Sequence, residues 1–382
     1  MKVHYELAPS LPTFNNAVLT IGTFDGVHKG HQKILEQLKK TASQINGETV
    51  IITFHPHPRK IVSSVPGDVK LLTTLQEKIN LLEKAGIDHL VVVPFDHHFS
   101  NLSAEAYITN FIVAYFKPHT VVIGYDHRFG KGRIGDFNLL EQVGKAHGFV
   151  VNEISEQVLQ ESVVSSTKIR ASIAAHDIET ANTFLGHPYF FDGLVVEGNK
   201  LGRTIGYPTA NLHIASEEKL IPSDGVYAVR VNINDANQVY DGMMNIGVRP
   251  TIDGKKRVVE VNIFDFDADI YGAQVKVELY YYLRGEVKFE GLEGLKAQEK
   301  SVQAVAGRVE NVLAFGKNHP NGEYLSESTI NNVTLNDVVL NYNTYYVPGN
   351  VLPYVKDSKG NLVPTPSGFV PLIAANGISS KT

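Results

Sequence analysis

The sequence predicts an α/β domain built on a parallel sheet, followed by a domain of antiparallel strands that ends in a helix. Two patterns predict this order. Over residues 1–186, short runs rich in valine and isoleucine alternate with segments of helical spacing, as in a parallel sheet with helices on both faces. Over residues 187–316, strand-like runs follow one another with turn residues between them, as in an antiparallel sandwich or barrel.

The strands and helices of the first domain are expected in strict alternation. The expected strands are AVLTIGTF (17–24), TVIITF (49–54), HLVVVPF (89–95), TVVIGYDH (120–127) and FVVNEI (149–154). The segments of helical spacing between them are 31–44, 73–86, 103–116 and 136–148. Further helices are expected over 165–175 and 178–186, after which Gly186 and Pro188 stop the pattern.

The second domain is expected to consist of strands closed by one helix. The strand-like runs are FFDGLVVEG (190–198), GVYAVRVNIN (225–234), QVYDGMMNIG (238–247), RVVEVNIFDF (257–266) and QVKVELYYYLR (274–284). The expected closing helix covers residues 292–314. Residues 317–382 then lose helical spacing and accumulate asparagine, tyrosine, valine and proline, which fits either a small β-rich appendage or a partly disordered tail.

The composition excludes several classes of protein. The chain of 382 residues carries 35 lysines and arginines against 40 acidic residues, a net charge of −5 that gives no sign of a nucleic-acid-binding surface. It has no cysteine, which excludes disulfide and thiolate chemistry. The first residues lack the profile of a signal peptide, and no apolar run is long enough to span a membrane. We expect a cytoplasmic protein that binds neither nucleic acid nor membrane, and the sequence gives no indication of its oligomeric state.

The stretch GTFDGVHKGH, residues 22–31, lies between the first expected strand and the first expected helix. Ligand sites of parallel sheets lie at the carboxyl ends of strands, and a glycine-rich turn into a helix offers N–H groups to phosphate. His28 and His31 are three residues apart, so their rings can point the same way and donate to a charged phosphate. The pair could also bind zinc, although the chain has no cysteine and no obvious third ligand nearby. A turn with two solvated histidines is the simplest alternative, but the position after the first strand favours phosphate.

Other segments of the first domain carry polar groups at places suited to ligands. VSSTKIR, residues 164–170, puts hydroxyls and basic groups at an expected helix start, either as a phosphate site or as an ordinary N-cap. His57 lies in the proline-locked segment FHPHP, for which a rigid loop is the simpler interpretation. Asp126 directly follows a buried strand, where it could contact a ribose, a flavin or a metal, or simply form a turn.

The second domain contains the glycine-rich segment GNKLGRTIGYPTANL, residues 198–212. Arg203 could reach a phosphate from this segment. Thr209 and Asn211 would share one face of an extended chain and could offer oxygen atoms to Mg²⁺. The segment is not a Walker A loop, because GK[ST] is absent. The residues alone favour an ordinary glycine-rich loop.

Taken in order along the chain, these motifs resemble the bacterial bifunctional riboflavin kinase/FAD synthetase family. HxGH after a first Rossmann-like strand is typical of nucleotidyltransferases, and GTFDGVHKGHQKIL resembles this family in particular. TFHPHP, GYDHRFGKGRIGD and VSSTKIR fit it too, with His127 where the family usually has phenylalanine. GRTIGYPTANL, GVYAV, NIGVRPT, VEVNIFDFDADIYG and LRGEVKFEGLEGLKAQ resemble its riboflavin kinase domain. The resemblance covers residues from about 15 to about 300.

The resemblance implies two reactions in two domains, with riboflavin, FMN and ATP as ligands. A β-barrel riboflavin kinase domain with a C-terminal helix (187–316) would convert riboflavin to FMN with Mg²⁺ and ATP. A Rossmann-like nucleotidyltransferase domain (1–186) would then adenylylate FMN to FAD and release pyrophosphate, and residues 317–382 stay unassigned. Two alternatives remain: another nucleotidyltransferase, which the second domain argues against, and a non-enzymatic flavin-binding protein, which the intact motifs argue against.

The resemblance also implies a role for each motif residue. The implied catalytic residues are His28, His31 and Glu260, the last as the base for a ribityl hydroxyl. The implied ATP- and phosphate-binding residues are Gly22, Phe24, Asp25, Gly30, Ser165, Ser166, Thr167, Arg170, Gly202 and Arg203. The implied flavin-binding residues are Asp126 and His57, and the implied Mg²⁺ ligands are Thr209 and Asn211.

Overall fold

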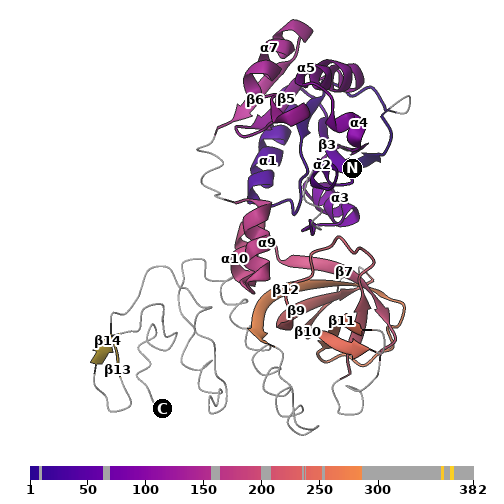
Figure 1. Ribbon diagram of the computed structural model, residues 1–382, viewed down its shortest axis with the longest axis vertical. Coiled ribbons are helices and arrows are strands. Elements are labelled where there is room, and N and C mark those ends of the chain that lie inside the picture. The colour runs from indigo at the N-terminus through magenta and orange to yellow at the C-terminus, as the bar shows by residue number, and fades with distance from the viewer. Residues whose placement is uncertain are drawn as a thin grey trace. The chain divides into compact units, whose positions relative to one another are not determined.

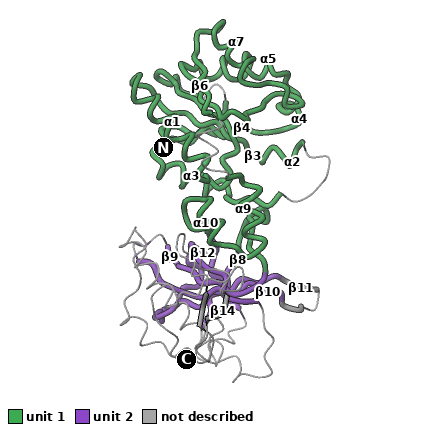
Figure 2. The backbone as a smooth tube through the Cα atoms, turned by 90° about the vertical axis from the view of Figure 1, so that its left-hand side faces the viewer, with its two compact units in different colours: residues 1–191, 214–223 green, residues 192–213, 224–382 purple. Residues whose placement is uncertain are grey.

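The computed structural model divides the chain into two units, coloured separately in Figure 2. The N-terminal unit consists of Met1–Phe191 and Ile214–Ser223, and the barrel unit of Asp192–His213 and Asp224–Thr382. The structure describes residues 1–7, 11–62, 69–155, 164–198, 208–234, 236, 238–251, 254–285, 354–356 and 362–364.

The N-terminal unit is built on a six-stranded parallel sheet in the order β1-β4-β3-β2-β5-β6. Its strands are β1 (Lys2–His4), β2 (Val18–Ile21), β3 (Thr49–His55), β4 (His89–Pro94), β5 (Thr120–Gly124) and β6 (Val150–Ile154). The central strands are buried on both faces, as their valine- and isoleucine-rich sequences predict. The expected parallel sheet is therefore confirmed.

Helices cover both faces of this sheet (Figure 1). They are α1 (Lys29–Gln44), α2 (Pro58–Val62), α3 (Leu75–Lys84), α4 (His97–Ser100), α5 (Ala104–Ala106), α6 (Ala114–Phe116), α7 (Phe137–His147), α9 (Ser166–Ala174) and α10 (Ile178–Leu185). A π-helix, Tyr107–Val113, continues α5 into α6, and Lys131–Arg133 forms a 3₁₀ turn. The expected helix over 103–116 is thus present, but its middle is wound more loosely than an α-helix.

The two faces of the sheet have separate cores, because successive strand residues point to opposite sides. In β4, Leu90 packs with α1 and α3, whereas its neighbour Val91 packs with the 104–116 helices and α7. In β5, Val121 and Val122 divide in the same way. This two-sided burial fixes the register of the sheet and therefore the positions of the turns at its carboxyl edge.

The barrel unit contains a closed barrel of strand order β10-β11-β8-β7-β12-β9. The strands are β7 (Tyr189–Val196), β8 (Ala210–His213), β9 (Gly225–Ile233), β10 (Val239–Thr251), β11 (Gly254–Ile263) and β12 (Gln274–Arg284). The pairings of β8 with β7 and β11, and of β9 with β10 and β12, are antiparallel. Alternate residues such as Val275, Val277 and Leu279 are buried, which is the pattern of a barrel wall with one face inside. The antiparallel barrel is confirmed.

Within the described parts of the two expected domains, two strands were not expected from the sequence. β1 is a three-residue edge strand, and β8 lies in the segment that the residues alone suggested was a loop. The expected closing helix over 292–314 lies outside the described residues, as does most of the segment after 317. Within that last segment, β13 (Tyr354–Lys356) and β14 (Leu362–Pro364) form a two-stranded antiparallel sheet.

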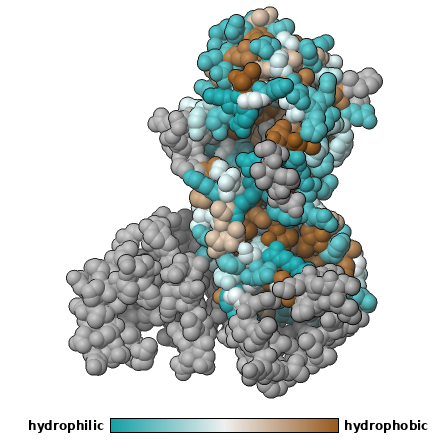
Figure 3. Space-filling model, in the orientation of Figure 1, coloured by the Kyte–Doolittle hydropathy of each residue, from teal (hydrophilic) through white to brown (hydrophobic). Residues whose placement is uncertain are grey.

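The surface of the described residues is mixed. On the face shown in Figure 3 the N-terminal unit is largely hydrophilic, with small apolar areas between polar side chains. No helix in the described ranges is both long and apolar enough to cross a membrane.

Candidate functional sites

The turn between β2 and α1 brings the two histidines of GTFDGVHKGH into direct contact. The rings of His28 and His31 stack with centroids 3.7 Å apart and an interplanar angle of 14°. His28 is the N-cap of α1, and its Nδ1 accepts a hydrogen bond from the His31 backbone N–H at 3.4 Å. The histidines therefore lie at the first turn of a helix and at the carboxyl end of a central strand, where a parallel sheet binds anions.

The glycine between the histidines leaves room for this contact. A Cβ at Gly30 would lie 3.3 Å from two atoms of the His28 ring, so a larger residue would displace the ring by a few tenths of an ångström. The turn itself needs Gly26, which has φ +83° and whose Cβ would lie 2.9 Å from Leu72 Cδ1. Phe24 is buried and places its ring 4.9 Å from that of His31. A Cβ at Gly22 would lie 3.2 Å from the Phe24 ring, so Gly22 leaves room for that ring, and the Phe24 side chain is a packing group.

Burial keeps both histidines neutral. Desolvation lowers the pKa of His28 to about 4, against a smaller opposite effect of Asp25. Desolvation, with the nearby His28 and Lys78, lowers the pKa of His31 well below its usual value. His31 Nδ1 is buried without a hydrogen-bond partner among the described residues. At neutral pH the pair can therefore donate or accept hydrogen bonds but carries no charge of its own.

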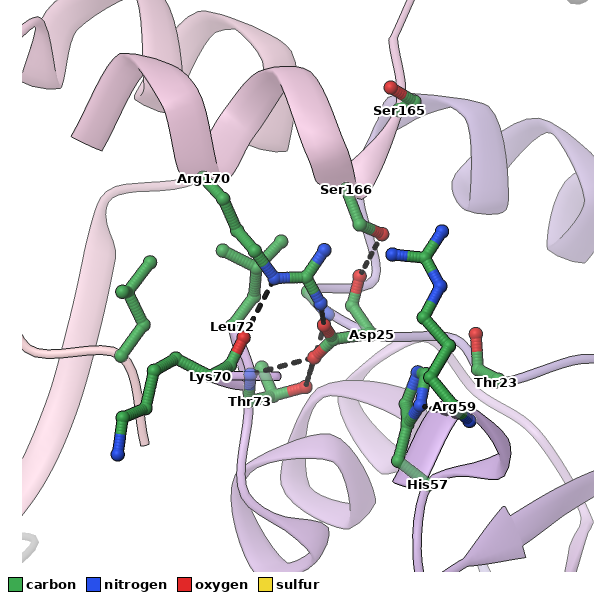
Figure 4. A network of polar contacts seen from close by, with 12 residues as sticks. Thr23, Asp25, His57, Arg59, Lys70, Leu72, Thr73, Ser165, Ser166 and Arg170 are labelled. Carbon is green, nitrogen blue, oxygen red and sulfur yellow. Dashed lines mark hydrogen bonds and ion pairs between the residues drawn. The ribbon is translucent and has the colours of Figure 1, made fainter. Parts of the chain in front are cut away.

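Asp25 is the centre of a polar network that closes the turn (Figure 4). Its side chain is almost fully buried and pairs with the guanidinium of Arg170. Asp25 Oδ1 also accepts from the backbone N–H of Thr73 at 3.0 Å and from the Thr73 hydroxyl at 3.4 Å. The carboxylate expected to bind ATP is therefore occupied by partners within the chain, and it fixes the shape of the turn.

The SSTKIR segment supplies the other side of this network. Ser166 Oγ donates to the Asp25 backbone carbonyl at 3.1 Å, and Arg170 Nε donates to the Lys70 carbonyl at 2.7 Å. Ser165 is the N-cap of α9 and accepts from the Lys168 backbone N–H, and Thr167 is exposed. The segment is both an N-cap, the simpler of the two interpretations, and a neighbour of the histidine turn.

Two expected flavin contacts lie at the same edge of the sheet. His57 follows β3 and Asp126 follows β5, and these strands flank β2. Desolvation lowers the pKa of His57 to about 4, and Asp126 is exposed in a turn. His127 Nε2 is buried without a partner in the described part of the chain. Figure 4 also shows Arg59, which the sequence motifs did not single out, extending its guanidinium towards Ser166.

A short segment between β8 and β9 contacts the loop that carries Thr73, a partner of Asp25. Lys219, in the stretch Ile214–Ser223, is buried; its Nζ lies 2.7 Å from Glu77 Oε2 and 2.6 Å from the Leu72 carbonyl. Leu71 and Lys219 form a parallel bridge. Leu72 precedes Thr73, which donates to the Asp25 carboxylate. The segment 214–223 therefore holds in place the loop that binds Asp25. Sequence inspection missed Lys219 because a lysine next to two glutamates is typical of an exposed surface.

The barrel brings together the second set of candidate residues. Glu260 in β11 lies directly opposite Asn211 in β8, so both side chains project from the same face of the barrel wall. A Cβ at Gly198 would lie 2.1 Å from Asn211 Nδ2, so the backbone of residue 198 packs against that amide. Thr209 is exposed directly before β8. Asn262 Nδ2 donates to the Pro208 carbonyl at 2.7 Å and anchors the start of the strand.

Two candidate phosphate-binding residues of the barrel unit cannot be placed. Gly202 and Arg203 lie outside the described residues. In the ranges that are described, no group of three or more histidine, cysteine, aspartate or glutamate side chains could bind a metal. The zinc interpretation of the two histidines therefore gains no third ligand there.

The fold and the two sites define a class of protein: a nucleotidyltransferase-type α/β unit joined to a barrel that has a separate polar site. Family profiles agree with this division, because that of FAD synthetase matches residues 11–168 and that of riboflavin kinase matches residues 185–308. The chain belongs to the bifunctional riboflavin kinase/FMN adenylyltransferase family.

Relatives of known activity cover most of the chain. The bifunctional riboflavin kinase/FMN adenylyltransferase of Listeria monocytogenes is 40% identical over 303 residues, which are 79% of this chain and 95% of the relative. That of Bacillus subtilis is 39% identical over 75% of this chain and 90% of its own length. A crystal structure from Streptococcus pneumoniae, named as a macrolide-efflux protein, has a TM-score of 0.70 and 32% identity, covering 78% of this chain and 95% of its own.

Proposed function

We propose that the two units of this chain carry out the two steps of FAD synthesis at the two sites described above. The barrel unit phosphorylates riboflavin to FMN with ATP. The N-terminal unit adenylylates FMN with a second ATP, giving FAD and pyrophosphate. Family membership supports both activities, and the assignment of residues to each step is our inference from their placement.

In the N-terminal unit, His28 and His31 contact the phosphates of ATP. An oxygen of the FMN phosphate attacks the α-phosphorus, the bond from that phosphorus to the β-phosphate oxygen breaks, and pyrophosphate leaves. Negative charge builds on the transferring group, and neutral imidazoles can donate hydrogen bonds to it. The stacked pair at the start of α1, with Gly30 between the two histidines in the sequence and close to the His28 ring, is the observation that carries this assignment. His57 and Asp126 lie at the neighbouring strand ends and are the proposed flavin contacts.

In the barrel unit, Glu260 accepts a proton from the ribityl hydroxyl as this oxygen attacks the γ-phosphorus of ATP. Thr209 and Asn211 are the proposed Mg²⁺ ligands, because hydroxyl and amide oxygens suit a hard cation. A bound Mg²⁺ would offset the phosphate charge. The pairing of Glu260 with Asn211 across β8 and β11 supports a shared site for base and metal.

Asp25 and Arg170 act mainly on each other in this scheme. Their ion pair keeps the histidine turn in place, and the exposed start of α9 at Ser165 and Thr167 is left to meet the nucleotide. We place both reactions in the cytoplasm, where ATP is abundant.

One assay tests the proposal. The protein is incubated with riboflavin, ATP and Mg²⁺, and riboflavin, FMN and FAD are separated over time. We expect FMN to form first and FAD to follow. Absence of both products would refute the kinase half, and FMN that accumulates without any FAD would refute the adenylyltransferase half.

A further inference from the structure

Lys78 has a buried amine that is linked to the histidine turn through the hydroxyl of Thr53. The residue lies in α3 and is 6% exposed. Its Nζ donates to Thr53 Oγ1 at 3.3 Å, and Thr53 Oγ1 donates to the Thr23 carbonyl at 3.2 Å. Thr53 lies near the end of β3 and Thr23 directly precedes Phe24 in the turn. The amine is therefore at the carboxyl edge of the two central strands, where we placed the phosphate site.

The charge on this amine is not neutralised locally. Lys78 forms no ion pair with any described residue, whereas the other buried lysine of this unit, Lys219, is paired with Glu77 at 2.7 Å. A favourable charge acts on Lys78 from Asp25, whose carboxylate is already paired with Arg170. Burying an ammonium without a paired anion is costly, so such a group is normally compensated by an anion.

The groups around Lys78 point to where that anion would lie. Its charge acts on His31 of α1 and on His57 after β3, and Asp25 acts on it from the turn. His31 Nδ1, in the same region, is buried without a hydrogen-bond partner in the described chain. An unpaired cation and an unsatisfied imidazole nitrogen thus lie close together at the end of β2, and both can be satisfied by one anionic ligand.

We propose that the ammonium of Lys78 is a further phosphate-binding group of the adenylyltransferase site, which attracts the polyphosphate of ATP from beneath the histidine turn. This inference rests on the proposed function of His28 and His31. The neutral histidines can donate hydrogen bonds but supply no charge, and Arg170 is committed to Asp25. Lys78 supplies the buried positive charge that stabilises the crowded phosphates as the α-phosphorus is attacked.

The protonation of Lys78 provides a specific signature. Desolvation lowers its pKa from 10.5 to about 8, with an opposite effect of Asp25. The charge that binds phosphate is therefore lost as the pH rises past about 8 in the free protein. An arginine at this position would remain charged throughout that range.

The test compares the full chain with Lys78→Gln, Lys78→Arg and the control Lys84→Gln, which removes an exposed charge from the same helix. FAD formation from FMN, ATP and Mg²⁺ is measured from pH 7 to 9.5, with FMN formation from riboflavin as an internal reference. Lys78→Gln can still donate to Thr53, and we expect its kcat/KM for ATP to fall about 10- to 100-fold. Lys78→Arg should keep most of the activity and lose less of it above pH 8 than the wild type. Lys84→Gln should match the wild type.

A second measurement covers the case in which a variant is poorly folded. Binding of inorganic pyrophosphate to the wild type is measured by calorimetry at pH 7 and pH 9.5, with Lys78→Arg as the reference, and it should weaken more in the wild type. A well-folded Lys78→Gln with wild-type kcat and KM for ATP, or equal weakening of pyrophosphate binding in both proteins, would overturn the inference. Failure of the wild type to form FAD from FMN would instead overturn the proposed function.

Discussion

The guanidinium of Arg170 in α9 is paired with the carboxylate of Asp25 in the turn after β2, which lies 145 residues earlier in the chain. The Asp25 side chain is 3% exposed and that of Arg170 is 18% exposed, so the pair is largely shielded from water. The pair joins the motifs GTFDGVHKGH and VSSTKIR of the N-terminal unit. Both residues therefore hold the histidine turn in shape before any substrate binds.

Replacing Arg170 with methionine should leave the Asp25 carboxylate buried without its cation. Breaking a buried pair in this way costs about 3–5 kcal/mol. We expect a lower melting temperature and slower FAD formation, measured by calorimetry and by product separation. In the double variant Asp25→Asn/Arg170→Met part of the lost stability should return, because no uncompensated charge remains. A double variant no more stable than the single one would contradict the importance of the pair.

The neutral state of His28 predicts how stability depends on pH. The folded pKa of His28 is about 4, whereas an unfolded histidine has a pKa near 6.5. As the pH falls below 6.5 the unfolded chain binds the proton first, so stability falls from pH 6.5 towards pH 4. Between pH 7.5 and pH 5, His28 should account for a loss of at most about 2 kcal/mol.

Urea unfolding of the wild type and of His28→Asn at these two pH values measures this contribution. The asparagine side chain at position 28 cannot be protonated, so the variant should lose less stability on acidification than the wild type. Equal losses in the two proteins would mean that His28 is not buried in its neutral form.

Because Lys219 is buried and paired with Glu77, we expect its replacement to lower the stability of the fold and to have no direct effect on the chemistry. Lys219→Met would leave Glu77 as a buried carboxylate without its cation and remove a donor to the Leu72 carbonyl. We expect a loss of about 3–5 kcal/mol in the free energy of unfolding. The double variant Lys219→Met/Glu77→Gln should be more stable than Lys219→Met, as thermal melts would show. If the single variant melts like the wild type, the 214–223 segment does not support the Asp25 loop.

Glu260 and Asn211 predict that the two activities can be separated. Glu260→Gln keeps the shape of the side chain and removes the proposed base, so FMN formation should fall by about 10²- to 10⁴-fold. FMN supplied from outside should still be converted to FAD, because this reaction belongs to the other unit. A riboflavin kinase rate near that of the wild type would rule out Glu260 as the base.

The sequence predicted the parallel sheet, the antiparallel strands and the shared direction of the His28 and His31 rings, because each depends on local spacing; the stacking of the two rings comes from the structure. It did not predict that Asp25 is buried, because its partners Thr73 and Arg170 are 48 and 145 residues away. Lys78 was missed for a related reason. A lysine within a helical pattern normally lies in solvent, and only the packing of α3 on the end of β3 shows that this one does not.

The most direct test of the account is the product distribution of His31→Ala. The variant is incubated with riboflavin, ATP and Mg²⁺, and riboflavin, FMN and FAD are separated at intervals. Loss of one donor to a transferring phosphate costs about 10²- to 10³-fold in rate. We therefore predict that FMN accumulates at the wild-type rate while FAD formation falls by at least about 10²-fold. FAD formation at the wild-type rate would contradict the assignment of the adenylyltransferase site to the histidine pair.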